Sequence, residues 1–291
     1  MDHKRVAKIK NAFFNSVLLI LVLLVTSCGK QSEIKIDVMS FNIRLDHVAD
    51  GSNNWKYRSD NVVQMFSYYS PDILGLQEVL KNQLDDLKKF LPEYINIGVG
   101  RADGKEMGEY CPIFFKAERF KLLKNGDFAL SENPDSIGDK GWDAACERIV
   151  TWAVLKDKKS SKEIAVFNTH FDHVGEVARR ESAKLLINKI KELAVSCPVI
   201  ITGDFNGTLD SEPVSILTED GMKNAFNTAK VVYGPSWSFH NFGSIPIDKR
   251  RLIDFIFVNE EIEVERYRTV DDKPDDGYLS DHAPVMAILK I

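Results

Sequence analysis

Several short apolar runs of this chain end in carboxylate, amide or imidazole side chains. These side chains are Asn42, Glu78, His170, Asp204 with Asn206, Asp254, and Asp281 with His282. Any one of them alone could be a turn cap or a surface charge. As a set they indicate one site, because strand ends in packed sheets place their side chains at one rim. Oxygen ligands of this kind bind hard cations, and imidazoles transfer protons.

The elements that position these side chains are predicted to be many short strands with few helices. Apolar alternation and apolar runs indicate strands at 34–41, 73–76, 94–99, 110–115, 149–155, 164–168, 199–202, 252–258 and 284–289, and helices at 61–69, 81–90 and 177–193. This mixed order predicts an α/β fold, a four-layer α/β sandwich in which two packed mixed β-sheets are flanked by helices. The tract 125–141, rich in Gly, Asp, Asn and Pro, predicts a long surface loop.

The N-terminus has the pattern of a secretion signal. Four basic side chains precede an apolar run at 17–25 that is too short to span a membrane. The next residues, Val25 to Gly29, resemble the bacterial lipobox, whose cysteine receives diacylglycerol. We predict a lipoprotein signal peptide at 1–27, a linker at 28–33 with lipidated Cys28, and one folded domain at 34–291. The alternatives are an ordinary signal peptide in which Cys28 is incidental, or an uncleaved anchor.

Lipid on Cys28 would hold the protein on a membrane surface through acyl chains. Gly29 stands where an aspartate would favour the inner membrane. By resemblance to the known sorting rule, the cell envelope is therefore the predicted location, with the bacterial outer membrane favoured and its face left open.

The charge of the mature chain argues against a protein that binds long nucleic acid. Removal of 1–27 takes away four basic side chains and Asp2, which leaves 34 basic against 42 acidic residues and a net charge of −8. Binding to a phosphate backbone normally needs a positive footprint. The local basic clusters Arg179 with Arg180, and Lys249 to Arg251, either face a substrate phosphate or form solvated surface.

The cysteines of the mature domain have no metal-ligand spacing. Cys111, Cys146 and Cys197 include no CxxC pair, and an odd number leaves at least one free thiol in an oxidising compartment. Cys197 is expected to be buried, and a Cys111–Cys146 disulfide is possible.

Six short segments, in this order, resemble the signature of the endonuclease/exonuclease/phosphatase superfamily, which has the deoxyribonuclease-I-like fold. They lie at 40–44, 76–79, 168–170, 203–206, 253–256 and 280–284. One segment alone carries little weight, but six in order span nearly the whole mature chain. The resemblance implies a hydrolase that uses a divalent metal, Mg²⁺ with Mn²⁺ as the alternative, to cleave a phosphoester.

The resemblance also implies roles for individual residues. The implied metal ligands are Glu78, Asn42 and Asp281, and the implied catalytic residues are His282, Asp254, Asp204, Asn206 and His170. His282, oriented by Asp254, contacts the phosphate or acts as acid and base; Asp204 activates the water. Asn206 and His170 donate to the non-bridging oxygens. The general base and the number of metals stay open.

Further residues are candidates for binding the substrate. Arg148, Tyr110 and His240 fall at more variable family positions, whereas His173, Arg179, Trp55, Arg58, Arg101 and Trp142 either line a pocket or only pack.

The superfamily implies a reaction class and not one molecule. We predict a phosphodiesterase or phosphatase, attached to a membrane, acting as a monomer on a small or lipid-like phosphoester rather than genomic DNA. The alternatives are a 3′-exonuclease or deadenylase-like nuclease acting on RNA or nucleotides, and a surface lipoprotein that binds without catalysis. A missing ligand would favour the last alternative, but all the implied site residues are present.

Overall fold

Two mixed β-sheets pack face to face in the centre of the molecule. A computed structural model describes residues 33–274 and 277–291. Within these residues the first sheet has the order β10-β12-β13-β1-β2-β4-β3 and the second the order β5-β6-β7-β8-β11-β9. The first contains β1 (Lys35–Asn42), β2 (Ile73–Gln77), β3 (Tyr94–Ile97), β4 (Ile113–Lys116), β10 (Val231–Tyr233), β12 (Glu263–Thr269) and β13 (Val285–Lys290). The second contains β5 (Phe120–Ala129), β6 (Ile149–Asp157), β7 (Glu163–His170), β8 (Val199–Asp204), β9 (Lys223–Asn224) and β11 (Asp254–Val258).

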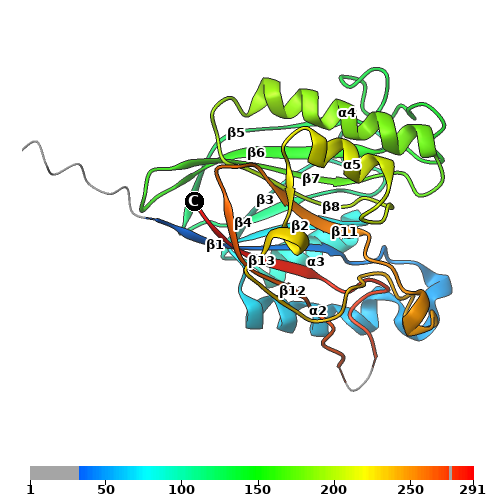
Figure 1. The fold of residues 1–291 in the computed structure, drawn as a ribbon. Coiled ribbons are helices and arrows are strands. Elements are labelled where there is room, and N and C mark those ends of the chain that lie inside the picture. Colours follow the sequence, from blue (N-terminus) through cyan, green and yellow to red (C-terminus); the bar gives the residue numbers. More distant parts are fainter. Residues whose placement is uncertain (1–32, 275–276) are drawn as a thin grey trace, which may run out of the picture. The chain divides into compact units, whose positions relative to one another are not determined.

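Helices cover the outer faces of both sheets. Figure 1 shows α2 (Trp55–Tyr69) and α3 (Lys81–Phe90) against the first sheet, and α4 (Glu176–Leu193) and α5 (Glu212–Glu219) against the second. Short turns complete the chain: η1 (Val48–Asn53), α6 (Ala225–Thr228) and η2 (Ile247–Lys249). The predicted α/β sandwich of two mixed sheets flanked by helices is therefore confirmed.

The predicted signal peptide at 1–27 and the lipidated Cys28 lie outside the described residues. Within 33–274 and 277–291, no helix is both long and apolar enough to cross a membrane.

Strand β1 shows how the sequence pattern builds the layers. Its side chains alternate between the two faces, so Ile36 and Val38 enter the core between the sheets. Met39 and Phe41 face the other way and pack with Phe66 of α2. Both faces of β1 are therefore buried. This explains why the strand lies in the middle of the sheet, although polar residues alternate with apolar ones in its sequence. Asn42 continues the inner face and reaches the rim.

A buried polar network joins the two sheets just beneath that rim. Gln77 Nε2 of β2 donates to Asn168 Oδ1 of β7 at 2.7 Å, and Thr202 Oγ1 of β8 donates to the same oxygen at 3.0 Å. Asn168 Nδ2 donates in turn to the Leu76 carbonyl at 2.7 Å. Hydrogen bonds of this kind offset the cost of burying polar groups and fix the alignment of the sheets.

Gly75 is required for this close approach, and Gly75→Ala is expected to destabilise the fold by about 3 kcal/mol. A Cβ at Gly75 would overlap the Thr202 side chain and lie 2.7 Å from Asn168 Oδ1. Urea unfolding measures the loss. Thr202→Ala in the same chain should recover part of it, and strictly additive effects would contradict the overlap.

Some predicted elements differ from those observed. The predicted loop at 125–141 is wrong in its first residues, because Phe120–Ala129 pairs with β6 and Gly126 packs against the Trp152 ring. The helix predicted at 61–69 begins earlier, at Trp55, since the Asn54 side chain accepts a hydrogen bond from Lys56 N and caps it. Strands β5, β9, β10 and β12 and helix α5 were not predicted; their stability depends on pairing and packing with distant segments.

The described cysteines are free thiols, so the possible Cys111–Cys146 disulfide is not formed. Cys111 is buried, whereas Cys197 is half-buried and the prediction of its burial was wrong.

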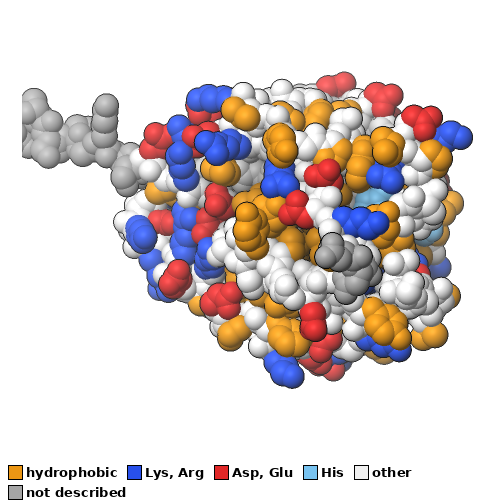
Figure 2. All heavy atoms as spheres, turned by 90° about the horizontal axis from the view of Figure 1, so that it is seen from below, with side chains coloured by type: hydrophobic (Ala, Val, Ile, Leu, Met, Phe, Trp, Pro, Cys, Tyr) orange, Lys and Arg blue, Asp and Glu red, His pale blue; other side chains and the backbone are white. Residues whose placement is uncertain are grey.

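Charges of both signs are mixed on the surface. On the face shown in Figure 2, Lys and Arg side chains of the described residues alternate with Asp and Glu side chains. Two surface ion pairs illustrate this, Lys35 with Glu265 at 2.6 Å and Lys230 with Glu263 at 2.5 Å. Such mixing agrees with the prediction of a substrate smaller than genomic DNA, which stays a prediction.

Candidate active site

The polar strand ends converge because of strand direction. β1 and β2 are parallel to each other, as are β7 and β8, whereas β13 and β11 are antiparallel to β1 and β8. The C-terminal ends of β1, β2, β7 and β8 therefore lie near the N-terminal ends of β11 and β13. His170 and Asp254 both pair with Asp204 in the register of the second sheet. Together these ends line a cavity of about 290 Å³, the catalytic cavity, whose walls include Glu78, His170, Asp204, Asn206, Asp281 and His282.

A buried histidine and two carboxylates form one wall. His282 Nδ1 lies 2.8 Å from Asp254 Oδ2, and His282 Nε2 lies 3.8 Å from Asp204 Oδ2. Burial favours the neutral ring, but the charges of Asp254 and Asp204 outweigh it and raise the pKa of His282 well above its usual value. Burial and the charge of Asp254 raise the pKa of Asp204 to about 7. A protonated imidazole and an adjacent carboxyl of near-neutral pKa are suited to proton transfer.

His170 has the opposite character. Burial, together with the charges of Arg148 and Arg101, lowers the pKa of His170 well below its usual value. Its Nε2 lies 3.0 Å from Asn206 Nδ2 and 3.5 Å from Asp204 Oδ2. Asn206 Nδ2 also donates to the Phe171 carbonyl at 2.9 Å. Asn206 is predicted to donate to a substrate oxygen. To do so, its Nδ2 must give up one of these two contacts.

The predicted metal ligands also meet. Asn42 Nδ2 donates to Glu78 Oε1 and to Asp204 Oδ2, both at 3.0 Å, and its Oδ1 accepts from Arg44 N. Burial raises the pKa of Asp281, and the negative charge of Glu78 adds to that effect. Arg44 Nη1 lies 3.8 Å from Glu78 Oε2 and 4.0 Å from Asp281 Oδ2.

These residues fit a divalent cation. Two carboxylates that repel each other at a half-enclosed rim are stabilised by a hard cation, which takes one or two carboxylates and keeps several waters. A second group, Asp204, Asp254 and His282, also brings one ligand atom each within 4.8 Å of one another. The number of metal ions, one or two, therefore stays open, as it was in the prediction from the sequence.

Two of the predicted site residues have left-handed backbone conformations. Glu78 has φ 59° and Asn206 has φ 46°, and each directly follows or nearly follows a strand. Non-glycine residues adopt this conformation at a cost of order 1 kcal/mol or more, which tends to be retained at functional sites. The turn at Glu78 redirects its carboxylate into the cavity.

Arg148 reaches the cavity from the start of β6. Its Nε donates to Asp172 Oδ2 at 3.2 Å, its Nη2 lies 2.9 Å from His173 Nδ1, and its buried Nη1 has no hydrogen-bond partner in the described residues. A buried guanidinium with an unused donor fits an anionic substrate oxygen. Asp172, which the sequence analysis missed, holds this arginine in place. Its local signal, an aspartate four residues before α4 that accepts from backbone amides, is shared by ordinary turns.

Asp172→Asn is expected to lower the free energy of unfolding by about 3–5 kcal/mol at pH 7. Burial opposes the charged form, but hydrogen bonds from Gly175, Val174 and Ala145 N–H and the charge of Arg148 outweigh it and lower the pKa of Asp172. Its stabilisation is therefore complete above about pH 4 and declines below it. Urea unfolding at pH 7 and pH 3 measures this. Asp135→Asn, an exposed change in the loop before β6, is the control, and a pH-independent gap would contradict the assignment.

The other candidate residues lie partly in the catalytic cavity and partly outside it. Arg101 lines the catalytic cavity in a bidentate pair with Glu109, at 2.7 and 2.8 Å. The structure does not bring Tyr110 to the lining, since its hydroxyl donates to the Lys105 carbonyl. His240 lies in a neighbouring cavity beside Trp237 and Tyr278.

Four less secure candidates also have defined places. Trp55 and Arg58 are buried, and Arg58 donates to the Ile43 and Leu279 carbonyls, so both serve packing. His173 lines the catalytic cavity, whereas Trp142 lies outside its lining.

This fold, with its rim of carboxylates and imidazoles, is that of metal-assisted phosphoester hydrolases. The sequence profile of the Endonuclease/Exonuclease/phosphatase family matches residues 39–282, and the chain belongs to this family.

Two solved structures are similar over most of the chain. An endonuclease/exonuclease/phosphatase from Bacteroides vulgatus is 46% identical, with a TM-score of 0.86 over 88% of this chain and 98% of that one. A mannosyl-6-phosphatase from Bacteroides thetaiotaomicron is 37% identical, with a TM-score of 0.84 over 87% and 99%.

Curated relatives are more distant. An uncharacterized protein of Acanthamoeba polyphaga mimivirus is 30% identical over 81% of this chain and 92% of its own length. A probable CCR4-Not complex 3′-5′-exoribonuclease subunit of Vairimorpha ceranae is 22% identical, and the match covers 52% of that protein.

Proposed function

We propose that this protein is a Mg²⁺-dependent phosphomonoesterase that removes phosphate from phosphorylated sugars. The observation that carries the proposal is the 37% identity, over nearly the full length of both chains, to a mannosyl-6-phosphatase. The protein itself is a member of a family of phosphoester hydrolases, and the carboxylates and imidazoles that line its catalytic cavity support such chemistry.

In the proposed reaction each residue has a separate role that follows from its position. Arg148 Nη1 binds a non-bridging phosphate oxygen, while Asp204 accepts the proton of the attacking water. His282, held by Asp254, donates a proton to the leaving sugar oxygen, because its raised pKa keeps it charged at neutral pH. Neutral His170 holds Asn206 beside the phosphate.

Glu78, Asn42 and Asp281 are the residues that would hold the cation. When bound, Mg²⁺ or Mn²⁺ neutralises phosphate charge and lowers the barrier to attack. The all-oxygen set favours these hard ions over zinc.

The test is a phosphatase assay on purified residues 29–291 with mannose 6-phosphate, a phosphodiester and an oligoribonucleotide, each with and without chelator. Metal-dependent release of phosphate from the sugar phosphate supports the proposal. Preference for the oligonucleotide would favour the alternative 3′-exonuclease, which the exoribonuclease relative supports. Lack of any turnover would favour a non-catalytic binding lipoprotein.

We further propose that lipid on Cys28 attaches the protein to a membrane of the cell envelope. The lipobox-like Val25 to Gly29 sequence supports this. Cys28→Ser is expected to move the protein from the membrane pellet to the soluble fraction on cell fractionation. Unchanged retention of the serine variant would count against the anchor.

A further inference from the structure

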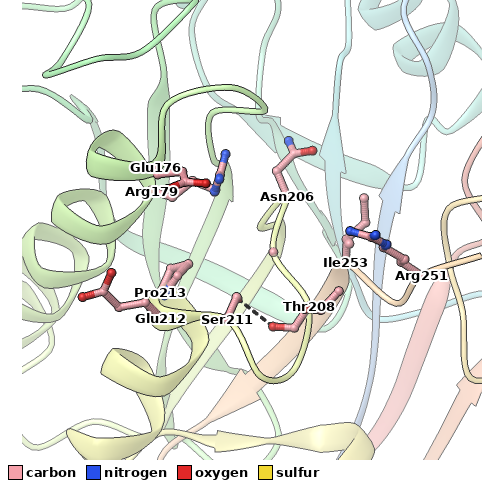
Figure 3. A pocket seen from close by; sticks show the side chains of 10 residues that line it. Glu176, Arg179, Asn206, Thr208, Ser211, Glu212, Pro213, Arg251 and Ile253 are labelled. Atoms are coloured by element: carbon pink, nitrogen blue, oxygen red, sulfur yellow. Dashed lines mark hydrogen bonds between the residues drawn. The ribbon is translucent and has the colours of Figure 1, made fainter.

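A second cavity adjoins the catalytic cavity. It has a volume of about 340 Å³ and shares Asn206 and Ile253 with the wall of the catalytic cavity. We call it the arginine cavity, because Arg179 of α4 and Arg251, just before β11, lie on opposite sides of it with Asn206 between them (Figure 3). No role in catalysis has been given to these two arginines.

The arginine cavity is polar and nearly balanced in charge. Besides the two arginines it is lined by Glu176 and Glu212, and the Thr208 and Ser211 side chains stand on its floor (Figure 3). A second phosphate would meet two carboxylates here. Neighbouring hydroxyls of a sugar, in contrast, donate to carboxylates and accept from guanidinium groups.

Several of these groups are fixed in place. Arg179 Nη1 donates to the Asp172 carbonyl at 2.9 Å, which orients a half-buried guanidinium. Gly207 allows the turn after Asn206 to close on Ser211, since a Cβ there would lie 2.5 Å from Ser211 Oγ. Ser211 Oγ donates to the Thr208 carbonyl at 2.6 Å. Prepositioned polar groups lower the entropic cost of binding a ligand with many hydroxyls.

Apolar surface is also present. Ile253 and Pro213 are buried and line the same cavity, so they offer contact to the C–H face of a ring. Arg251 is exposed, and its charge acts on the exposed carboxylate of Asp210. Its guanidinium points toward the cavity in Figure 3 and is available to a ligand.

We propose that the arginine cavity binds the hydroxyl groups of the sugar whose phosphate occupies the catalytic cavity. Arg251 and Arg179 donate to neighbouring hydroxyls, and Glu176 accepts from one. This inference rests on the proposed sugar-phosphate hydrolysis and adds the residues that select the sugar. Asn206 stands where the two parts of the substrate join.

The experiment compares Arg251→Gln with wild-type residues 29–291 on mannose 6-phosphate and on p-nitrophenyl phosphate, which has no sugar hydroxyls. The variant is expected to raise KM for the sugar phosphate about tenfold, because a hydrogen bond from a charged group is lost. Values for the aryl phosphate should stay within about twofold. Arg266→Gln, an exposed change in β12 outside both cavities, is the control and should change neither.

Equal losses on both substrates, or no loss on either, would overturn the assignment. So would a larger loss on a sugar bisphosphate than on the monophosphate, since the arginines would then serve a second phosphate. If the wild type hydrolyses no phosphomonoester, the proposed function is wrong, and a binding measurement then tests the arginine cavity separately. NMR titration of labelled protein with mannose should then shift the Asn206 side-chain amide in the wild type but not in Arg251→Gln; absence of that shift overturns the inference.

Discussion

Replacement of Asp254 by asparagine is expected to lower kcat by about three to four orders of magnitude. The carboxylate lies 2.8 Å from His282 Nδ1 and is fully buried. An amide at this position can donate to Nδ1, which reverses the tautomer and removes the negative charge that keeps the ring protonated. Steady-state kinetics on the best phosphomonoester measures the change, and circular dichroism checks that the fold is retained.

The same pair makes a second test possible. Because Asp254 acts through His282, the double variant with His282→Ala should be no slower than His282→Ala alone. Multiplicative losses would show that the two residues act independently and would contradict the proposed pair. Ser238 Oγ accepts a hydrogen bond from the Asp254 backbone N–H at 3.1 Å. The side-chain change should leave this hydrogen bond in place, so its retention shows that the local structure is intact.

Glu78→Gln is expected to lower kcat/KM by about a hundredfold to a thousandfold, because a charged metal ligand is worth several kcal/mol. The two side chains have the same shape, but the glutamine NH2 group cannot accept, so one of the hydrogen bonds from Asn42 Nδ2 and Leu45 N–H is lost as well. Raising the Mg²⁺ concentration should recover part of the activity. Glu106→Gln, with an exposed side chain on a nearby loop, is the matched control.

Thermal unfolding measures the metal separately from turnover. An ion that binds only the folded state raises Tm with its concentration. The wild type should therefore gain stability with Mg²⁺ or Mn²⁺, and Glu78→Gln should gain less. Activity that survives both a chelator and Glu78→Gln would falsify metal-assisted hydrolysis in this protein.

The site could be predicted from the sequence as a set of residues but not as a geometry. Glu78, Asp204 and His282 were found because each follows or precedes an apolar run, and the structure brings them together as expected. Asp172 was missed because it acts through Arg148 and backbone amides of a loop, which no local pattern distinguishes from an ordinary turn. Tyr110 has the right neighbours in sequence, yet its hydroxyl is used inside its own loop.

The fold could be predicted where one strand carries its own signal. β2 and β8 begin as continuous apolar runs, and β1 alternates apolar with polar residues, so each has a clear strand pattern. β5 contains Lys121, Lys124 and Asn125, and four of its ten residues are exposed. Its strand conformation comes from pairing with β6, which a composition rich in loop residues conceals.

The sequence by itself determined the family, the two-sheet class of fold and the residue types of the site, because apolar periodicity and the order of polar strand ends are local properties. Only the tertiary structure decided which charges meet. Burial lowers the pKa of both His170 and His282, but the charges of Arg148 and Arg101 add to this effect at His170, whereas those of Asp254 and Asp204 outweigh it at His282. The arginine cavity likewise joins residues more than 70 positions apart, and its existence depends on the end of β8 lying beside the beginning of β11.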